Sequence, residues 1–146
     1  MRTGWVMLLA LAACSPPGPT LPGTLQRTAC AAGCAEYTVT VDVDGNVAWN
    51  GTNNVGHVGM ATAKLTDETR IHLVVAADET DFCKRVSTSS CDPDAASAVL
   101  TFDCGGKNKV ITAVQGCDSS TANAIALNDL ANILDTLVNT AQWINP

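Results

Sequence analysis

Cysteine is the residue type that most constrains how this chain can fold. Seven cysteines occur in 146 residues, and an odd number leaves one thiol without a partner inside the chain. A chain of this length forms one domain around a single core. The first question is therefore which cysteine stands apart from the other six.

Cys14 stands apart because it follows an apolar N-terminal segment. One basic residue, Arg2, precedes the apolar run 5–13, which is typical of a secretory signal and too short to span a membrane. The run ends in Leu11-Ala12-Ala13-Cys14, which resembles the lipobox of bacterial lipoproteins. The resemblance implies cleavage before Cys14 and acylation of its thiol and new amine. We therefore expect a chain held at a membrane by N-terminal acyl chains.

The same resemblance implies a location and a division of the chain. Ser15, following the lipidated residue, favours transfer to the outer membrane, with the domain facing either the periplasm or the outside. We expect a signal peptide at residues 1–13, a lipidated cysteine and Pro/Gly-rich stalk at 14–26, and one globular domain at 27–146. Losing Arg2 leaves seven basic residues against fourteen acidic ones, which disfavours nucleic acid as a partner.

The other six cysteines are an even number in an exported chain, so three disulfides are expected. They are Cys30, Cys34, Cys83, Cys91, Cys104 and Cys117. Zinc is disfavoured because the first two form the only tight pair, and neither His57 nor His72 lies beside a cysteine. We expect no metal and no cofactor.

Six cysteines allow fifteen pairings, and their spacing alone does not choose among them. Cys30–Cys34 is a plausible local bridge. A hairpin of segments 97–102 and 109–114, folded about Gly106, would bring Cys91 near Cys117 and leave Cys83 for Cys104. The competing set, Cys83–Cys91 with Cys104–Cys117, closes smaller loops and stays open.

The first half of the chain shows strand patterns. Apolar and polar residues alternate strictly over Tyr37–Val43, as in a half-buried strand. A three-residue turn at 44–46 would then pair Val43 with Val47 and keep the apolar residues on one face. A third extended segment is expected over 55–65, where two glycines suggest a bulge.

Two helices complete the prediction. Thr66 can cap the first helix, and residues 117–120 can cap a final helix that runs to about Thr140 with a broad apolar stripe. Trp143 and Ile144 then fold back or close the core. The predicted order is β-β-(β)-α-β-β-α, an α+β fold in which an antiparallel sheet carries two helices on one face and is stapled by disulfides.

No catalytic constellation emerges from the residues. The segment Asp42–Asn46 lacks the spacing of a calcium loop and is interpreted as a hairpin turn. Segment 105–109 is a basic hairpin turn rather than a phosphate cradle. His57 with nearby acids is the only motivation for an enzyme. We therefore name no catalytic residue.

Several short motifs follow one another in a fixed order. They are Cys30-Ala31-Ala32-Gly33-Cys34-Ala35-Glu36-Tyr37, Gly45-Asn46-Val47-Ala48-Trp49-Asn50-Gly51, Cys91-Asp92-Pro93, Gly116-Cys117 and Trp143-Ile144. Together they resemble an uncharacterised domain of bacterial secreted proteins and lipoproteins, catalogued as a domain of unknown function. The resemblance implies the same fold order and the Cys91–Cys117 pairing, and it carries no activity.

These observations favour a non-catalytic, lipid-anchored domain of the cell envelope that binds a protein or another envelope component. Tyr37, Trp49 and Trp143 are the candidate aromatic anchors, although packing in the core is the favoured role of each. Two alternatives are a periplasmic enzyme or enzyme inhibitor with a site around His57, and a carrier of a small ligand, which would need an apolar cavity.

Overall fold

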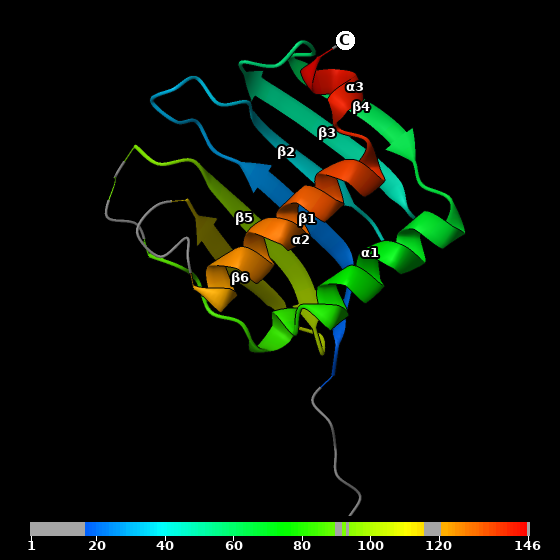
Figure 1. Ribbon diagram of the computed structural model, residues 1–146. Helices are drawn as coiled ribbons and strands as arrows, with labels where there is room; N and C mark the ends of the chain where they lie inside the picture. The colour runs from blue at the N-terminus through cyan, green and yellow to red at the C-terminus, as the bar shows by residue number, and fades with distance from the viewer. Residues whose placement is uncertain (1–16, 90–91, 93, 116–120, 146) are drawn as a thin grey trace, which may run out of the picture.

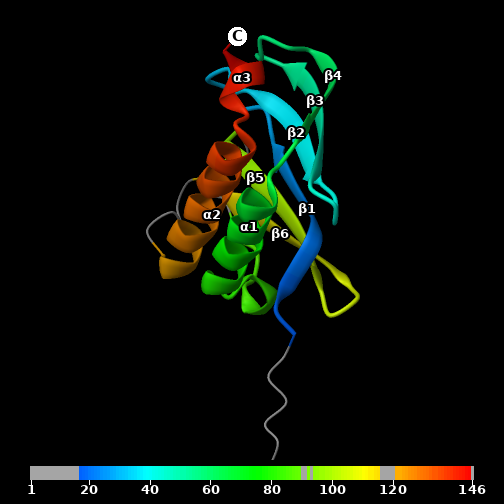
Figure 2. The same ribbon diagram turned by 90° about the vertical axis from the view of Figure 1, so that its right-hand side faces the viewer.

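Six antiparallel strands form one sheet, and helices pack on one of its faces (Figures 1 and 2). The computed structural model describes residues 17–89, 92, 94–115 and 121–145. The strands, in the spatial order β4-β3-β2-β1-β5-β6, are β1 (Pro19–Arg27), β2 (Glu36–Val41), β3 (Asn46–Asn53), β4 (Gly59–Lys64), β5 (Ser97–Cys104) and β6 (Asn108–Val114). The helices are α1 (Asp67–Glu79), the short 3-10 helix η1 (Phe82–Lys84), α2 (Ala122–Val138) and α3 (Ala141–Ile144). An α+β fold with an antiparallel sheet is confirmed, with one strand more at the start and two short helices more, η1 after α1 and α3 at the end, than predicted.

Strand β1 corrects the predicted stalk. Residues 19–27 lie in the middle of the sheet, paired with β2 on one side and β5 on the other. The pairing with β5 shifts register between Thr20 and Gly23, so Pro22, which has no N–H, sits at an irregularity rather than in a regular ladder. Leu25 is completely buried. The globular domain therefore begins before residue 27, and the stalk does not reach residue 26.

The turn between β2 and β3 also differs from the prediction. Val47 pairs with Val41 and not with Val43, because Asp42 ends the strand. Its carboxylate accepts hydrogen bonds from the backbone N–H groups of Asp44 at 2.9 Å and Asn46 at 2.8 Å, and Gly45 supplies the positive φ of +82° that the turn requires. The shift of two residues keeps the same faces toward the core, but it leaves Val43 exposed.

Capping residues set the ends of the helices. Thr66 caps α1, as predicted, and accepts a hydrogen bond from the N–H of Thr69 at 3.1 Å. Thr121 caps α2, whereas the predicted cap at 117–120 lies outside the described residues. Helix α2 ends at Val138 because Asn139 adopts the left-handed conformation, slightly before the predicted end.

The three candidate aromatic anchors belong to the core. Trp49 stacks on Tyr37 and on Trp143, with ring centroids 4.5 and 5.1 Å apart. Helix α3 carries Trp143 into this stack, and all three rings are buried. They stabilise the fold and are not available to a partner.

Two disulfides follow the favoured pairing. Cys30 is bonded to Cys34, and Cys83 is bonded to Cys104. The second bond excludes the competing set, which required Cys83 to pair with Cys91. Cys91 and Cys117 lie outside the described residues, so their pairing stays a prediction. No helix in the described parts of the chain is long and apolar enough to cross a membrane.

Candidate functional site

No described helix or loop covers the face of the sheet opposite the helices (Figure 2). Strand alternation turns every second side chain toward this face, and the strand register aligns the central ones in two rows that cross all six strands. One row is Thr62, Ala48, Thr40, Thr24, Thr101 and Val110, and the other is Met60, Asn50, Thr38, Gln26, Val99 and Thr112. We call these twelve residues the open sheet face.

The open sheet face contains no charged side chain, and half of its residues are threonine. The charges that point the same way lie at the ends of the strands: Glu36 at one end, and Asp42, Lys64 and Asp103 at the other. An uncharged centre within a charged rim is the usual composition of a protein interface.

Stiff side chains cover the open sheet face. Threonine and valine have restricted χ1 rotamers, and the hydroxyl oxygens of Thr24 and Thr40 lie 3.2 Å apart at its centre. Side chains that are already ordered lose little entropy when a partner covers them. Met60 and Val110, on the two edge strands, are strongly exposed apolar residues. The open sheet face is therefore suited to bind an uncharged surface of a partner.

A groove of about 340 Å³ lies between α1, β1 and the β2–β3 turn. It is lined by Thr20, Leu21, Val43, Arg70, Ile71, Val74 and Val75. Arg70 donates to the carbonyl of Val43 at 2.6 Å through Nη1, while its buried Nε has no partner among the described residues. This groove has the volume of a small-ligand site and offers an apolar wall with one cation.

A polar network joins α2 to the central strands. Asp135 accepts hydrogen bonds from the Tyr37 hydroxyl at 2.5 Å, from Thr140 Oγ1 at 3.0 Å and from Arg27 at 2.7 and 3.1 Å. Burial, together with the neighbouring carboxylate, raises the pKa of Tyr37 well above its ordinary value. Tyr37 therefore remains a donor, and both oxygens of Asp135 are already engaged. The network is a structural clamp.

The two histidines do not form a catalytic arrangement among the described residues. His57 is exposed, with Nε2 3.2 Å from the carbonyl of Met60, and His72 is exposed on α1. Neither forms an ion pair with a carboxylate in the portion of the chain that is described. That portion also has no cluster of three or more His, Cys, Asp or Glu side chains suited to a metal. Cys14 lies outside it.

Sequence reasoning missed the open sheet face. A signal was present, because the positions of segment 36–50 that point away from the core include Thr38, Thr40, Ala48 and Asn50, none of them charged. The signal became interpretable only when β1 was placed beside β2 and carried Thr24 and Gln26 into the same rows.

The family model of a domain of unknown function (DUF6438) matches residues 24–138. The chain belongs to this family. No curated protein matches it. The matched part of the DUF6438 domain begins inside β1 and ends with α2, so it contains all twelve residues of the open sheet face.

Proposed function

We propose that this DUF6438 domain is a lipid-anchored, non-catalytic component of a bacterial cell envelope that binds another protein through its open sheet face. The observation that carries the proposal is the uncharged surface, which extends across all six strands and has charges only at its rim. The anchor rests on the lipobox-like sequence that ends at Cys14.

The chemistry of the face favours a protein over other partners. A nucleic acid would require a basic surface, and a sugar would gain from an exposed aromatic ring, whereas the five aromatic residues of the described chain are buried. Two rows of residues extend about 13 Å along the strands, and six strands about 4.8 Å apart then present roughly 400 Å². An area of this size, about half the ~800 Å² per partner of a standard interface, fits a transient complex.

Crosslinking from the centre of the face tests the binding proposal. A photoreactive amino acid at Thr40, in cells of the native host, should form one adduct larger than the chain. The same photoreactive amino acid placed at Thr136, an exposed threonine of α2, should form no adduct. Thr40→Lys should abolish co-purification of the partner while Thr136→Lys preserves it, with circular dichroism showing both variants folded. Equal behaviour at the two positions would refute the proposal.

Mass spectrometry of the membrane fraction tests the anchor. The mature chain should begin at Cys14 and carry acyl chains, and Cys14→Ser should release the protein from the membrane fraction. An unacylated chain in the native envelope would contradict the anchor.

The groove beside α1 supports a second candidate function, a carrier of an anionic amphiphile. An alkyl chain would lie on Leu21 and Val74, with its anionic head near Arg70. Binding of a fluorescent fatty acid should be lost in Ile71→Asp and retained in Ile125→Asp, which changes an exposed isoleucine on α2. Equal binding by the two variants would exclude the groove.

A further inference from the structure

The N-terminal segment is held against the domain from Pro17 onward. Pro17, Gly18 and Pro19 line a small pocket of about 80 Å³ with residues of α1 and η1. A Cβ added at Gly105 would lie 2.5 Å from Pro17 Cγ, and one at Gly18 would lie 2.8 Å from Asp78 Oδ1. Two glycines therefore permit close packing here, and the chain is fixed to the domain before β1 begins.

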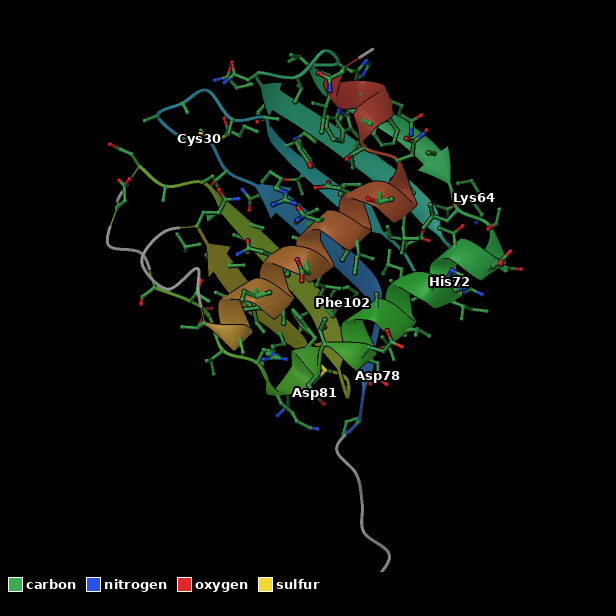
Figure 3. The ribbon with its side chains drawn as sticks, in the orientation of Figure 1. Cys30, Lys64, His72, Asp78, Asp81 and Phe102 are labelled. Carbon is green, nitrogen blue, oxygen red and sulfur yellow. A yellow bond between two sulfur atoms is a disulfide. The ribbon has the colours of Figure 1, made fainter. Side chains whose placement is uncertain are left out.

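The described residues next to this segment belong to one end of the molecule, which we call the tether end. It comprises the end of α1, η1 and the β5–β6 turn, and the chain enters β1 from it (Figures 1 and 2). Figure 3 shows Asp78 and Asp81 at this end and Cys30 at the opposite one. Pro19 pairs with Cys104, and Cys104 is disulfide-bonded to Cys83 beside η1. The attachment is therefore rigid.

Only two residues, Ser15 and Pro16, separate Cys14 from Pro17. Three residue steps of at most about 3.6 Å span no more than about 11 Å. If Cys14 carries acyl chains in a bilayer, the tether end is therefore held within about that distance of the lipid headgroups. A stalk reaching to residue 26 would have left the domain free to turn.

Charge is distributed unevenly between the tether end and the rest of the domain. The tether end carries the cations Lys84, Arg85, Lys107 and Lys109 and the four carboxylates of Asp78, Glu79, Asp81 and Asp103. The remaining described residues carry three cations and nine carboxylates. The excess negative charge of the described chain thus lies away from the tether end. An anionic membrane surface would therefore repel the tether end less than it repels the rest of the described domain taken as a whole.

We propose that the tether end docks on anionic phospholipid headgroups, with exposed Lys107 at the tip of the β5–β6 turn directed toward the phosphates. This inference rests on the acylation of Cys14 that the proposed function includes. Docking in this way places the Cys30–Cys34 end away from the membrane and leaves the open sheet face at the side of the domain, where a partner can reach it (Figures 2 and 3).

Fluorescence quenching in vesicles tests the docking. The acylated full-length mature protein is placed in vesicles of phosphatidylethanolamine and phosphatidylglycerol that contain lipids with a nitroxide headgroup. A fluorophore attached through a non-natural amino acid replaces either Asn108, where β6 begins, or Val58, an exposed residue of the β3–β4 loop. This loop lies at the end of the molecule opposite the tether end (Figure 1). Fluorescence at position 108 should be strongly quenched and that at position 58 should not. Equal quenching would overturn the inference.

A matched pair of charge reversals tests the role of Lys107. Lys107→Glu should lower the ratio of docked to undocked molecules by at least about fivefold, reducing quenching at position 108. Lys64→Glu, the same change on β4 away from the tether end, should leave quenching unchanged. Equal effects of the two substitutions would show that only net charge matters and would contradict the proposed contact.

Mass spectrometry of the same protein preparation distinguishes failure of the lipid anchor from failure of the docking. A native chain without acyl groups on Cys14 refutes the lipid anchor. An acylated chain that shows equal quenching at positions 108 and 58 refutes the docking alone.

Discussion

Asp135 shows how one side chain can fix a helix to a sheet. It lies on α2, and its carboxylate accepts from Arg27 of β1, Tyr37 of β2 and Thr140, which follows α2. The side chains of Arg27 and Asp135 are 17% and 21% exposed, so solvent screens the pair only in part. Removing the carboxylate would leave a largely buried guanidinium and hydroxyl without their acceptor.

Asp135→Ala should lower the free energy of unfolding by about 3 kcal/mol, because breaking one partner of a mostly buried ion pair leaves the other uncompensated. Urea denaturation followed by circular dichroism measures this change. Asp129→Ala, at an exposed position of the same helix, should change it by less than about 0.5 kcal/mol. Similar losses in the two variants would show that the network does not clamp α2.

The ionisation of Asp42 should make the free energy of unfolding depend on pH in the acidic range. Hydrogen bonds from the side chain and backbone of Asn46 lower the pKa of Asp42 below its ordinary value. Since the folded pKa lies below the unfolded one, the stabilisation is complete above the unfolded pKa and is lost as the pH falls through the folded pKa.

The urea midpoint of the native chain should therefore fall more steeply as the pH drops below about 4, the ordinary pKa of an aspartate, than that of Asp42→Asn, which keeps an acceptor but cannot ionise. Asp44→Asn, in the same turn, should retain the native slope. A native slope in Asp42→Asn would contradict this role of the carboxylate.

At the scale of elements, β1 decides the architecture. Without it, β2 and β5 would each expose an edge, since β1 pairs with both. Within β1, Gly23 packs directly against the ring of Phe102. A Cβ added at Gly23 would lie 2.8 Å from Cε1 of that ring. A glycine that weakens local strand propensity is therefore required for packing at the centre of the sheet.

Elements with a local cause could be predicted from the sequence. Alternation indicated β2 and β3, Thr66 marked the start of α1, and the two segments around Gly106 formed the expected hairpin. The position of β1 depends on pairing with β5, more than seventy residues away, and its prolines and glycines favour a linker on local grounds. The open sheet face could not be predicted before β1 was placed.

Truncation distinguishes a strand from a stalk. A chain that begins at Pro17 should unfold cooperatively, whereas one that begins at Thr28 lacks β1 and should show no cooperative transition. Thermal unfolding followed by circular dichroism and the dispersion of amide NMR signals measure the difference. If residues 17–27 were only a spacer, both chains would fold equally well.

At the scale of the whole molecule, the helical layer and the sheet are joined at both ends. At the tether end, Cys83 after α1 is bonded to Cys104 of β5, and the rings of Phe82 and Phe102 meet edge to face with centroids 5.0 Å apart. At the opposite end, Trp143 of α3 stacks on Trp49 of β3. The first junction is covalent and connects segments that are distant in sequence, so it restrains the unfolded chain more than a local bridge does.

Replacing both cysteines of each bridge by alanine should therefore have unequal effects. The Cys83–Cys104 bridge spans 21 residues and the Cys30–Cys34 bridge spans 4, and loop-closure entropy predicts losses of about 3 and about 2 kcal/mol. Urea denaturation at neutral pH without reductant measures both variants against the native chain. A larger loss from the Cys30–Cys34 pair would show that the short bridge acts mainly through contacts in the folded state. In that case the bridge that stabilises the fold more would lie at the end of the molecule opposite the tether end. The rigid attachment of the tether end would then depend on the pairing of β1 and on side-chain packing rather than on the Cys83–Cys104 bridge.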